Sequence, residues 1–91
     1  MSVRIYIHPN LFGFTDQVEI AEVSGGTVGE CIRKLIQRFP ALQGELLDKQ
    51  GGKVLSVFDI WVNGVSAFPE ELAKRVSDGD EIYITMVIAD G

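Results

Sequence analysis

Two side chains of this sequence carry reactive groups, the imidazole of His8 and the thiol of Cys31. His8 ends an alternating segment and has no second histidine or cysteine nearby, so we expect a solvated or capping side chain rather than a ligand or base. Cys31 falls at an apolar position of a helical pattern, whereas a reactive thiol needs exposure and a lowered pKa. We therefore expect Cys31 to fill the core as a small hydrophobe.

Two further groups of residues resemble binding or acid–base motifs. Gly25-Gly26-Thr27 precedes a predicted helix, whose free amide groups attract anions, but the lysine pattern of a phosphate-binding loop is absent. The three residues are therefore better explained as a helix entry. The other group is a set of carboxylates that could serve acid–base chemistry or metal binding. Each lies where a turn or a helix start already favours an acidic side chain, which is the simpler explanation. Its members are Glu70, Glu71, Asp78, Asp80 and Glu81.

The composition excludes several classes of function. The 91 residues suffice for one domain, and a single cysteine cannot supply a disulfide framework or the cysteine sets of iron–sulfur and structural zinc sites, so we expect no metal site. A formal net charge of −5 would repel a phosphate backbone, which argues against a nucleic-acid partner. No apolar run approaches the roughly 20 residues of a membrane span, and the start lacks a leader pattern. We expect a cytoplasmic protein without a membrane partner.

Hydrophobic periodicity predicts the elements that position these residues. Alternating apolar residues predict strands over 3–7, 58–62 and 81–87. A less regular strand is expected over 17–23, with Val18 and Ile20 facing inward.

One helix is indicated by both its cap and its apolar stripe. Thr27 and Glu30 have the spacing of a capping box, apolar residues then recur at helical spacing from Val28 to Phe39, and Pro40 ends the pattern. Shorter helical turns are expected over 42–48 and 69–74, and tight turns at 63–64 and 78–80.

The aromatic residues of the strands suggest a binding surface. If the isoleucines of the strands point to the helix, Tyr6, Trp61 and Tyr83 point to the opposite face, which a domain with one helix leaves uncovered. Aromatic side chains with a polar group, clustered on an open face, are frequent anchors of protein interfaces. The alternative is that Trp61 packs beneath the loop that holds Phe12 and Phe14.

Taken in order, several segments resemble the MoaD/ThiS-type ubiquitin-like sulfur carriers, a family that includes the small subunit of molybdopterin synthase and the carriers of thiamine and cysteine biosynthesis. The segments are VRIYI, TVGECIRKL, WVNG, DGDEIYI and a glycine a few residues after the last strand. The resemblance implies an α+β β-grasp fold, with a mixed four- to five-stranded sheet and one main helix packed on one face. It implies a β-grasp domain over 1–87 and a flexible tail over 88–91. The additional segment 42–57 is more similar to the molybdopterin or cysteine-biosynthesis branch than to the compact thiamine carriers.

The same resemblance implies a carrier rather than an enzyme. In this family the carboxylate of the terminal glycine, here Gly91, is adenylated by a ubiquitin-activating-type adenylyltransferase that uses ATP and magnesium, and a sulfur donor then converts it to a thiocarboxylate. The tail delivers the sulfur inside an acceptor enzyme, such as the large subunit of a synthase, and no cofactor is bound by the carrier itself. Molybdopterin or tungstopterin biosynthesis is the first expectation, with cysteine or thiamine biosynthesis as alternatives.

The tail is the part of the sequence on which this function depends. Val87, Ile88, Ala89 and Asp90 would contact the partner beside the aromatic face, and glycine suits a narrow channel because it lacks a Cβ. The family ends in Gly-Gly, whereas this sequence has Asp90 before Gly91, which places a negative charge next to the group that must approach ATP. The alternative function is therefore a β-grasp subunit that binds a larger enzyme without carrying sulfur.

Overall fold

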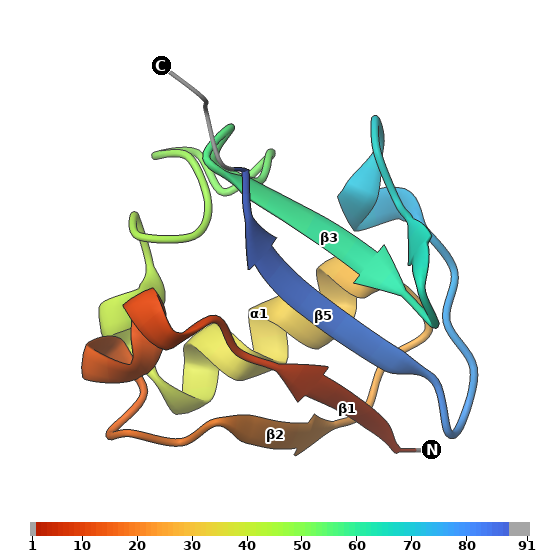
Figure 1. The fold of residues 1–91 in the computed structure, drawn as a ribbon, viewed down its shortest axis with the longest axis horizontal. Helices are drawn as coiled ribbons and strands as arrows, with labels where there is room; N and C mark the ends of the chain where they lie inside the picture. Colours follow the sequence, from red (N-terminus) through yellow and green to blue (C-terminus); the bar gives the residue numbers. More distant parts are fainter. Residues whose placement is uncertain (1, 88–91) are drawn as a thin grey trace.

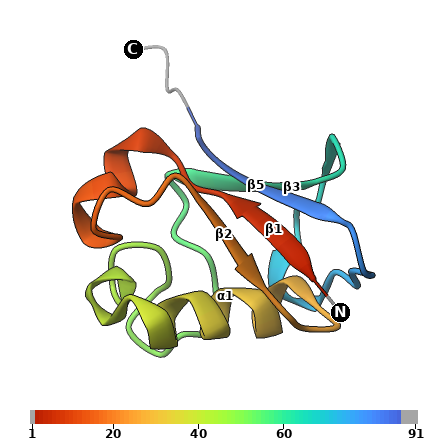
Figure 2. The ribbon, with the colours of Figure 1, turned by 90° about the horizontal axis from the view of Figure 1, so that it is seen from below.

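The computed structural model describes residues 2–87 as one sheet with a helix across one face (Figures 1 and 2). Among these residues no helix is long and apolar enough to cross a membrane. The elements in chain order are β1 (Val3–Tyr6), the 3₁₀ helix η1 (Pro9–Phe14), β2 (Ile20–Val23), α1 (Val28–Arg38), the 3₁₀ helix η2 (Pro40–Leu42), β3 (Phe58–Val62), β4 (Val65–Ser66), the 3₁₀ helix η3 (Glu71–Ala73) and β5 (Glu81–Met86).

The sheet has five strands in the order β2-β1-β5-β3-β4. Its two central strands, β1 and β5, are parallel, and all the other pairs are antiparallel. The first and last strands therefore lie side by side at the centre although they are far apart in the sequence (Figure 1). This arrangement confirms the predicted β-grasp fold and its mixed sheet.

Helix α1 begins and ends where the sequence predicts. The Thr27 hydroxyl accepts the Glu30 N–H at 3.1 Å, and the Glu30 carboxylate in turn accepts the Gly26 N–H at 2.7 Å. The carboxylate thus reaches one residue further back than in a standard capping box, but it still satisfies a free donor at the helix start. Phe39 follows the last turn, where its N–H bonds to the Leu35 carbonyl, and proline prevents continuation.

The core lies between α1 and the sheet. It includes the apolar stripe of the helix and the inward positions of the strands, because alternate residues of a strand point to opposite faces. Its fully buried large side chains include Ile5, Ile32, Leu35, Leu42, Leu46, Ile60 and Ile82.

The prediction for the second strand was wrong in extent and in register. The strand spans only four residues, Ile20 is 50% exposed, and Ala21 is the buried member. The cause lies just before the strand, where Asp16 and Gln17 both have positive φ and turn the chain before it joins β1. Val18 packs against the core as predicted, but it lies in the loop before β2 and not in the strand.

The segment after β3 contains an element that the sequence did not reveal. Asn63 and Gly64 both have positive φ, as a tight hairpin turn requires, and lead into the two-residue strand β4. The helical turn expected over 69–74 is the 3₁₀ helix η3, which packs against the start of α1. A Cβ at Gly29 would lie 2.8 Å from the Leu72 carbonyl oxygen, so only glycine permits this close approach.

Candidate functional site

One row of side chains crosses the sheet face that α1 does not cover. The strand registers place Ile20 opposite Tyr6, Tyr6 opposite Tyr83, Tyr83 opposite Trp61, and Trp61 opposite Ser66. Figure 1 views the sheet from this side, with the helix behind it. Three of the five members are aromatic and half-buried, and Ile20 is half-exposed. We call these five residues the aromatic row.

The aromatic residues are held in place by contacts with one another and with the sheet. The rings of Tyr6 and Tyr83 stack with their centroids 4.2 Å apart and their planes 5° from parallel. The indole N–H of Trp61 donates to the Thr85 hydroxyl at 3.1 Å. The structure thus brings together the three aromatic residues that the sequence assigned to the open face.

The alternative position for Trp61, beneath the loop of residues 12–14, is not what the structure shows. Phe12 and Phe14 are partly buried and pack against the core cluster, whereas Trp61 bonds to Thr85 on the opposite face of the sheet. Trp61 is therefore available to a partner.

A carboxylate borders the aromatic row on one side. Glu81 accepts hydrogen bonds from the Tyr6 hydroxyl at 2.8 Å and from the Tyr83 hydroxyl at 3.4 Å. It also lies 3.9 Å from the Arg4 guanidinium, which is 3.8 Å from Glu22. Partial burial, followed by the negative charge of Glu81, raises the pKa of the Tyr83 hydroxyl. The Tyr83 hydroxyl therefore stays protonated at neutral pH.

On the other side of the row come Thr85 and Asp59, and beyond them β5 ends beside two exposed valines. The Val87 N–H donates to the Val57 carbonyl at 2.8 Å, and the two side chains are 44% and 48% exposed. By strand alternation Val87 shares the face of Tyr83. The remaining predicted positions, Ile88, Ala89, Asp90 and Gly91, lie outside the described residues. The predicted tail over 88–91 therefore stays a prediction.

Ile20 and Glu81 belong to this site although the sequence pattern does not indicate it. The pattern predicts Ile20 in the core, and it is half-exposed; Glu81 is one of several carboxylates at a predicted turn. The strand registers carry the missing information, because each residue is next to Tyr6 or Tyr83 only once the strands pair. The periodicity of one strand does not predict which residues of another strand it pairs with.

The two reactive side chains have structural roles. The His8 Nδ1 accepts the Asn10 N–H at 3.0 Å and caps η1, which agrees with the expected capping histidine. Cys31 is fully buried in the core, and burial, its largest influence, raises the pKa of the thiol. Both outcomes argue against a nucleophile or base at these positions.

The carboxylates of the turn before β5 bind backbone and side-chain groups nearby. Asp80 accepts the Asn63 amide at 3.0 Å and the Ser77 N–H at 2.7 Å, and these bonds lower its pKa. Asp78 accepts the Ser2 N–H. Within residues 2–87 no three His, Cys, Asp or Glu side chains lie close enough to hold a metal ion.

No family model and no curated protein matches the sequence. The fold, however, is similar to that of several solved structures. A chain of the BexX/CysO complex from Amycolatopsis orientalis matches with a TM-score of 0.85 and 27% identity, over 98% of this chain and 99% of that chain. CysO of Mycobacterium tuberculosis matches with a TM-score of 0.85 and 27% identity, over 94% of this chain and 99% of that chain.

SAMP1 from Haloferax volcanii has a TM-score of 0.83 over the full length of both chains, but at 20% identity it supports the fold alone. The chain has the fold of the MoaD/ThiS-type ubiquitin-like sulfur carriers. In this β-grasp chain the helix and the inward strand residues form the shared scaffold, and the aromatic row occupies the face that the scaffold leaves open.

Proposed function

We propose that this β-grasp chain is a sulfur carrier whose C-terminal Gly91 holds the sulfur. The observation that carries the proposal is the similarity over almost the whole of both chains to the Amycolatopsis orientalis complex that contains CysO, and to CysO of Mycobacterium tuberculosis. The site itself supports a carrier, because residues 2–87 present an open face of aromatic side chains that suits a partner enzyme.

The chemistry takes place at the Gly91 carboxylate on partner enzymes. A carboxylate oxygen attacks the α-phosphorus of ATP on an adenylyltransferase, pyrophosphate leaves, and an acyl adenylate forms. Sulfide from a sulfur donor then attacks the acyl carbon, AMP leaves, and the thiocarboxylate remains. Activation is needed because a free carboxylate is a poor electrophile. ATP and magnesium belong to the partner, and this chain supplies the acyl group.

The aromatic row is the surface that we assign to the partner enzyme. Tyr6, Trp61 and Tyr83 offer rigid aromatic area with polar tips, the combination that dominates protein interfaces. Val87 lies on the same face and is the last described residue before the tail. A partner that covers this face therefore contacts the domain directly beside the start of the tail.

The acceptor of the sulfur is proposed to be the large subunit of a cofactor-producing synthase, of the molybdopterin or tungstopterin type. Enzymes of cysteine and thiamine biosynthesis are the other acceptor classes. The acidic chain suits basic partner surfaces, because complementary charge speeds association. Asp90 would need a basic residue or a wide channel in the partner, since a second negative charge lies next to the carboxylate that is activated.

The direct test is the intact mass of the full chain after incubation with the adenylating enzyme encoded beside it, ATP, magnesium and sulfide. Replacing one oxygen by sulfur raises the mass by about 16 Da. Deleting Gly91 should abolish the increase, and Asp90→Gly should keep or speed it. A chain that binds the enzyme normally yet gains no mass, with or without Asp90→Gly, would instead be a subunit that does not carry sulfur.

A further inference from the structure

The edge of β3 that faces β4 can be defined from the hydrogen bonds of the sheet. The Val87 N–H donates to the Val57 carbonyl at 2.8 Å, and the Asn63 N–H donates to the Glu81 carbonyl at 2.9 Å. Bonded pairs alternate along an antiparallel ladder, so the odd-numbered residues of this stretch bond to β5. The backbone groups of the even-numbered residues therefore point to the opposite edge.

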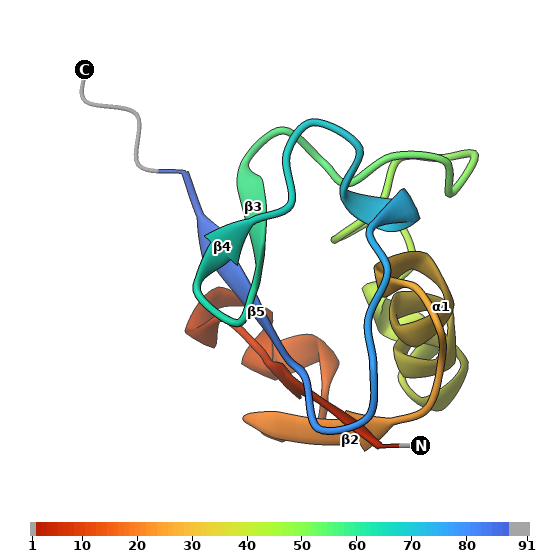
Figure 3. The same cartoon turned by 90° about the vertical axis from the view of Figure 1, so that its right-hand side faces the viewer.

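Strand β4 covers only part of that edge. The Ala67 N–H donates to the Ile60 carbonyl at 2.9 Å, and the Phe58 N–H donates to the Leu55 carbonyl at 3.0 Å. Among residues 2–87, neither the Ile60 N–H nor the Phe58 carbonyl has a hydrogen-bond partner. Figure 3 shows the reason, because the chain turns away from β3 after β4 and crosses toward α1.

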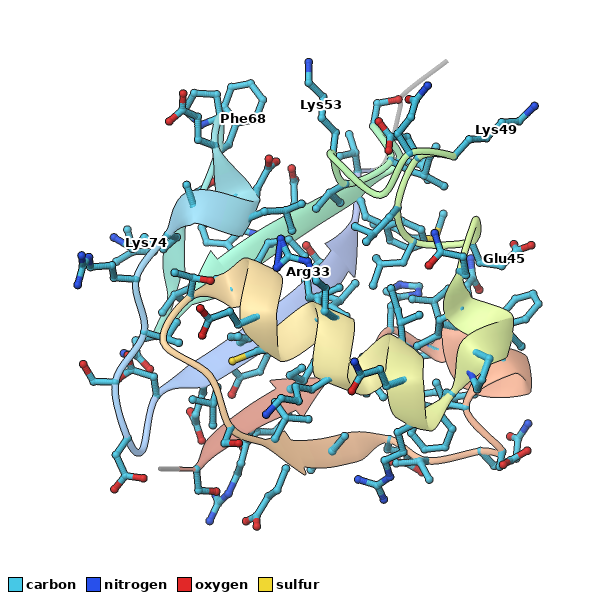
Figure 4. All side chains as sticks on the ribbon, turned by 180° about the vertical axis from the view of Figure 1, so that it is seen from behind. Arg33, Glu45, Lys49, Lys53, Phe68 and Lys74 are labelled. Atoms are coloured by element: carbon cyan, nitrogen blue, oxygen red, sulfur yellow. The ribbon has the colours of Figure 1, made fainter. Side chains whose placement is uncertain are left out.

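The Phe58 carbonyl belongs to a residue that lines a largely apolar groove of about 800 Å³, and the Ile60 N–H lies two residues further along the same edge, just outside that lining. One wall is the loop of residues 52–56 and the other is the segment 68–73. Figure 4 shows Lys53 and Phe68 projecting outward from the two walls, and Phe68 is 71% exposed. A backbone group that is buried without a hydrogen bond raises the free energy of the fold. A ligand that bonds to this edge and fills the groove would therefore be stabilised both by the new hydrogen bonds and by burial of apolar surface.

The charges of the groove favour a cationic ligand. Asp59, Glu70 and Glu71 line it, and Lys53 is the only cation among its lining residues. Within residues 2–87 none of the three carboxylates forms an ion pair. The groove therefore has a largely apolar lining with an excess of negative charge.

We propose that this groove binds an extended segment of a partner protein, which adds to β3 as a short parallel strand. A residue opposite Asp59 would donate its N–H to the Phe58 carbonyl and accept the Ile60 N–H, which is the bonding pattern of a parallel pair. Its side chain would share the face of Asp59 and should be basic, while its two neighbours would point toward the apolar groove. The preferred sequence is apolar–basic–apolar.

This inference does not depend on sulfur transfer. Binding at the β3 edge uses neither Gly91 nor ATP, so a chain that fails to gain sulfur can still bind the peptide, and the reverse also holds. The groove is separate from the aromatic row, although Val87 lines it and lies on the same face as Tyr83.

The test uses the full chain labelled with ¹⁵N and three blocked pentapeptides with the centres Val-Lys-Val, Val-Glu-Val and Ser-Lys-Ser. We expect Val-Lys-Val to bind about tenfold more tightly than the other two. The Ile60 amide should shift and exchange its hydrogen more slowly, because only a new hydrogen bond protects it.

Variants separate the parts of the site. Asp59→Lys should reverse the preference toward Val-Glu-Val, and Phe68→Ser should weaken Val-Lys-Val about fivefold. Val65→Ser is the matched control, because Val65 is also an exposed hydrophobic residue, at 61%, but does not line the groove. The proposal is overturned by an absence of binding, by shifts centred on the aromatic row, by an unprotected Ile60 amide, or by self-association through this edge without peptide.

Discussion

Ile60 and Ile84 lie on the helix side of the sheet and are 1% and 2% exposed. Their neighbours in the same strands, Trp61 and Tyr83, lie on the other side and are only half-buried. The first pair belongs to a core that α1 closes. The second pair meets other side chains of the sheet but no covering element within residues 2–87. The same two strands thus serve a packed face and an open face.

The difference indicates that stability and partner binding, the two requirements on this small domain, depend on separate faces of the sheet. Residues of the packed face determine stability, because their apolar area leaves water on folding. Residues of the open face are fixed by stacking and by bonds to Glu81 and Thr85, so they are ordered before any partner arrives. Substitutions on the packed face should therefore change stability more than association, and substitutions on the open face should change association more than stability.

The largest expected effect on stability is that of Ile84→Ala. Removing three carbon atoms from a site that is 2% exposed leaves a cavity between the sheet and α1. We expect a loss of about 2–5 kcal/mol in the free energy of unfolding, measured with urea.

Thr85→Ala is the matched change on the open face, one position further along the same strand. It removes the acceptor of the Trp61 N–H but opens no cavity in the core, so the loss should stay below about 1.5 kcal/mol. Equal losses for Ile84→Ala and Thr85→Ala would contradict the separation of the two faces.

An effect on association rather than stability, smaller than that of Ile84→Ala, is expected for Trp61→Ala and Tyr83→Ala. If the aromatic row anchors the adenylating enzyme, each change should weaken the complex by about 2 kcal/mol, or about 30-fold in Kd. Calorimetric titration of the enzyme with each variant measures this change.

Val65→Ser serves as the control for association, because Val65 is more exposed than either aromatic residue but lies outside the row. We expect its Kd to stay within about twofold of the original. If Val65→Ser weakens the complex as much as Trp61→Ala does, the partner docks elsewhere.

The parts of the fold that the sequence predicted are those with strong local patterns. The capping pair Thr27 and Glu30, the stripe of α1 and the alternation of β3 and β5 each repeat over enough residues to define an element. Strand β4 has two residues, too few for any period, and β2 follows a turn with positive φ at Asp16 and Gln17 that periodicity does not detect.

The site was predictable to the extent that it follows from alternation. Once Ile60 and Ile84 were assigned to the core, Trp61 and Tyr83 had to lie on the other face. The stacking of the two tyrosines and the role of Glu81 depend on the parallel pairing of β1 with β5, which joins residues almost eighty positions apart. The groove beside β3 depends on where the chain leaves β4, and no local pattern encodes that path.

The smallest predicted effect concerns the titration of Tyr83, which reports directly on the open face. The pKa of its hydroxyl is raised above the ordinary value of 10.0, first by partial burial and then by the charge of Glu81. The folded state therefore holds this proton more tightly than the unfolded state. The stability it contributes is complete below pH 10 and is lost as the pH rises through the raised pKa.

Glu81→Gln should lower the pKa of Tyr83 toward 10 without reaching it, because burial, the larger cause, remains. Chemical shifts of ¹³C-labelled tyrosine rings follow the two tyrosines of the chain separately during a titration. Asp59→Asn is the control, since Asp59 lies on the same face but is not among the causes of the shift. If Glu81→Gln leaves the pKa of Tyr83 unchanged, the hydrogen bond at 3.4 Å does not hold this ring, and only stacking on Tyr6 orders the row. A lowered pKa with unchanged urea stability would show instead that Glu81 orders the open face without stabilising the packed one.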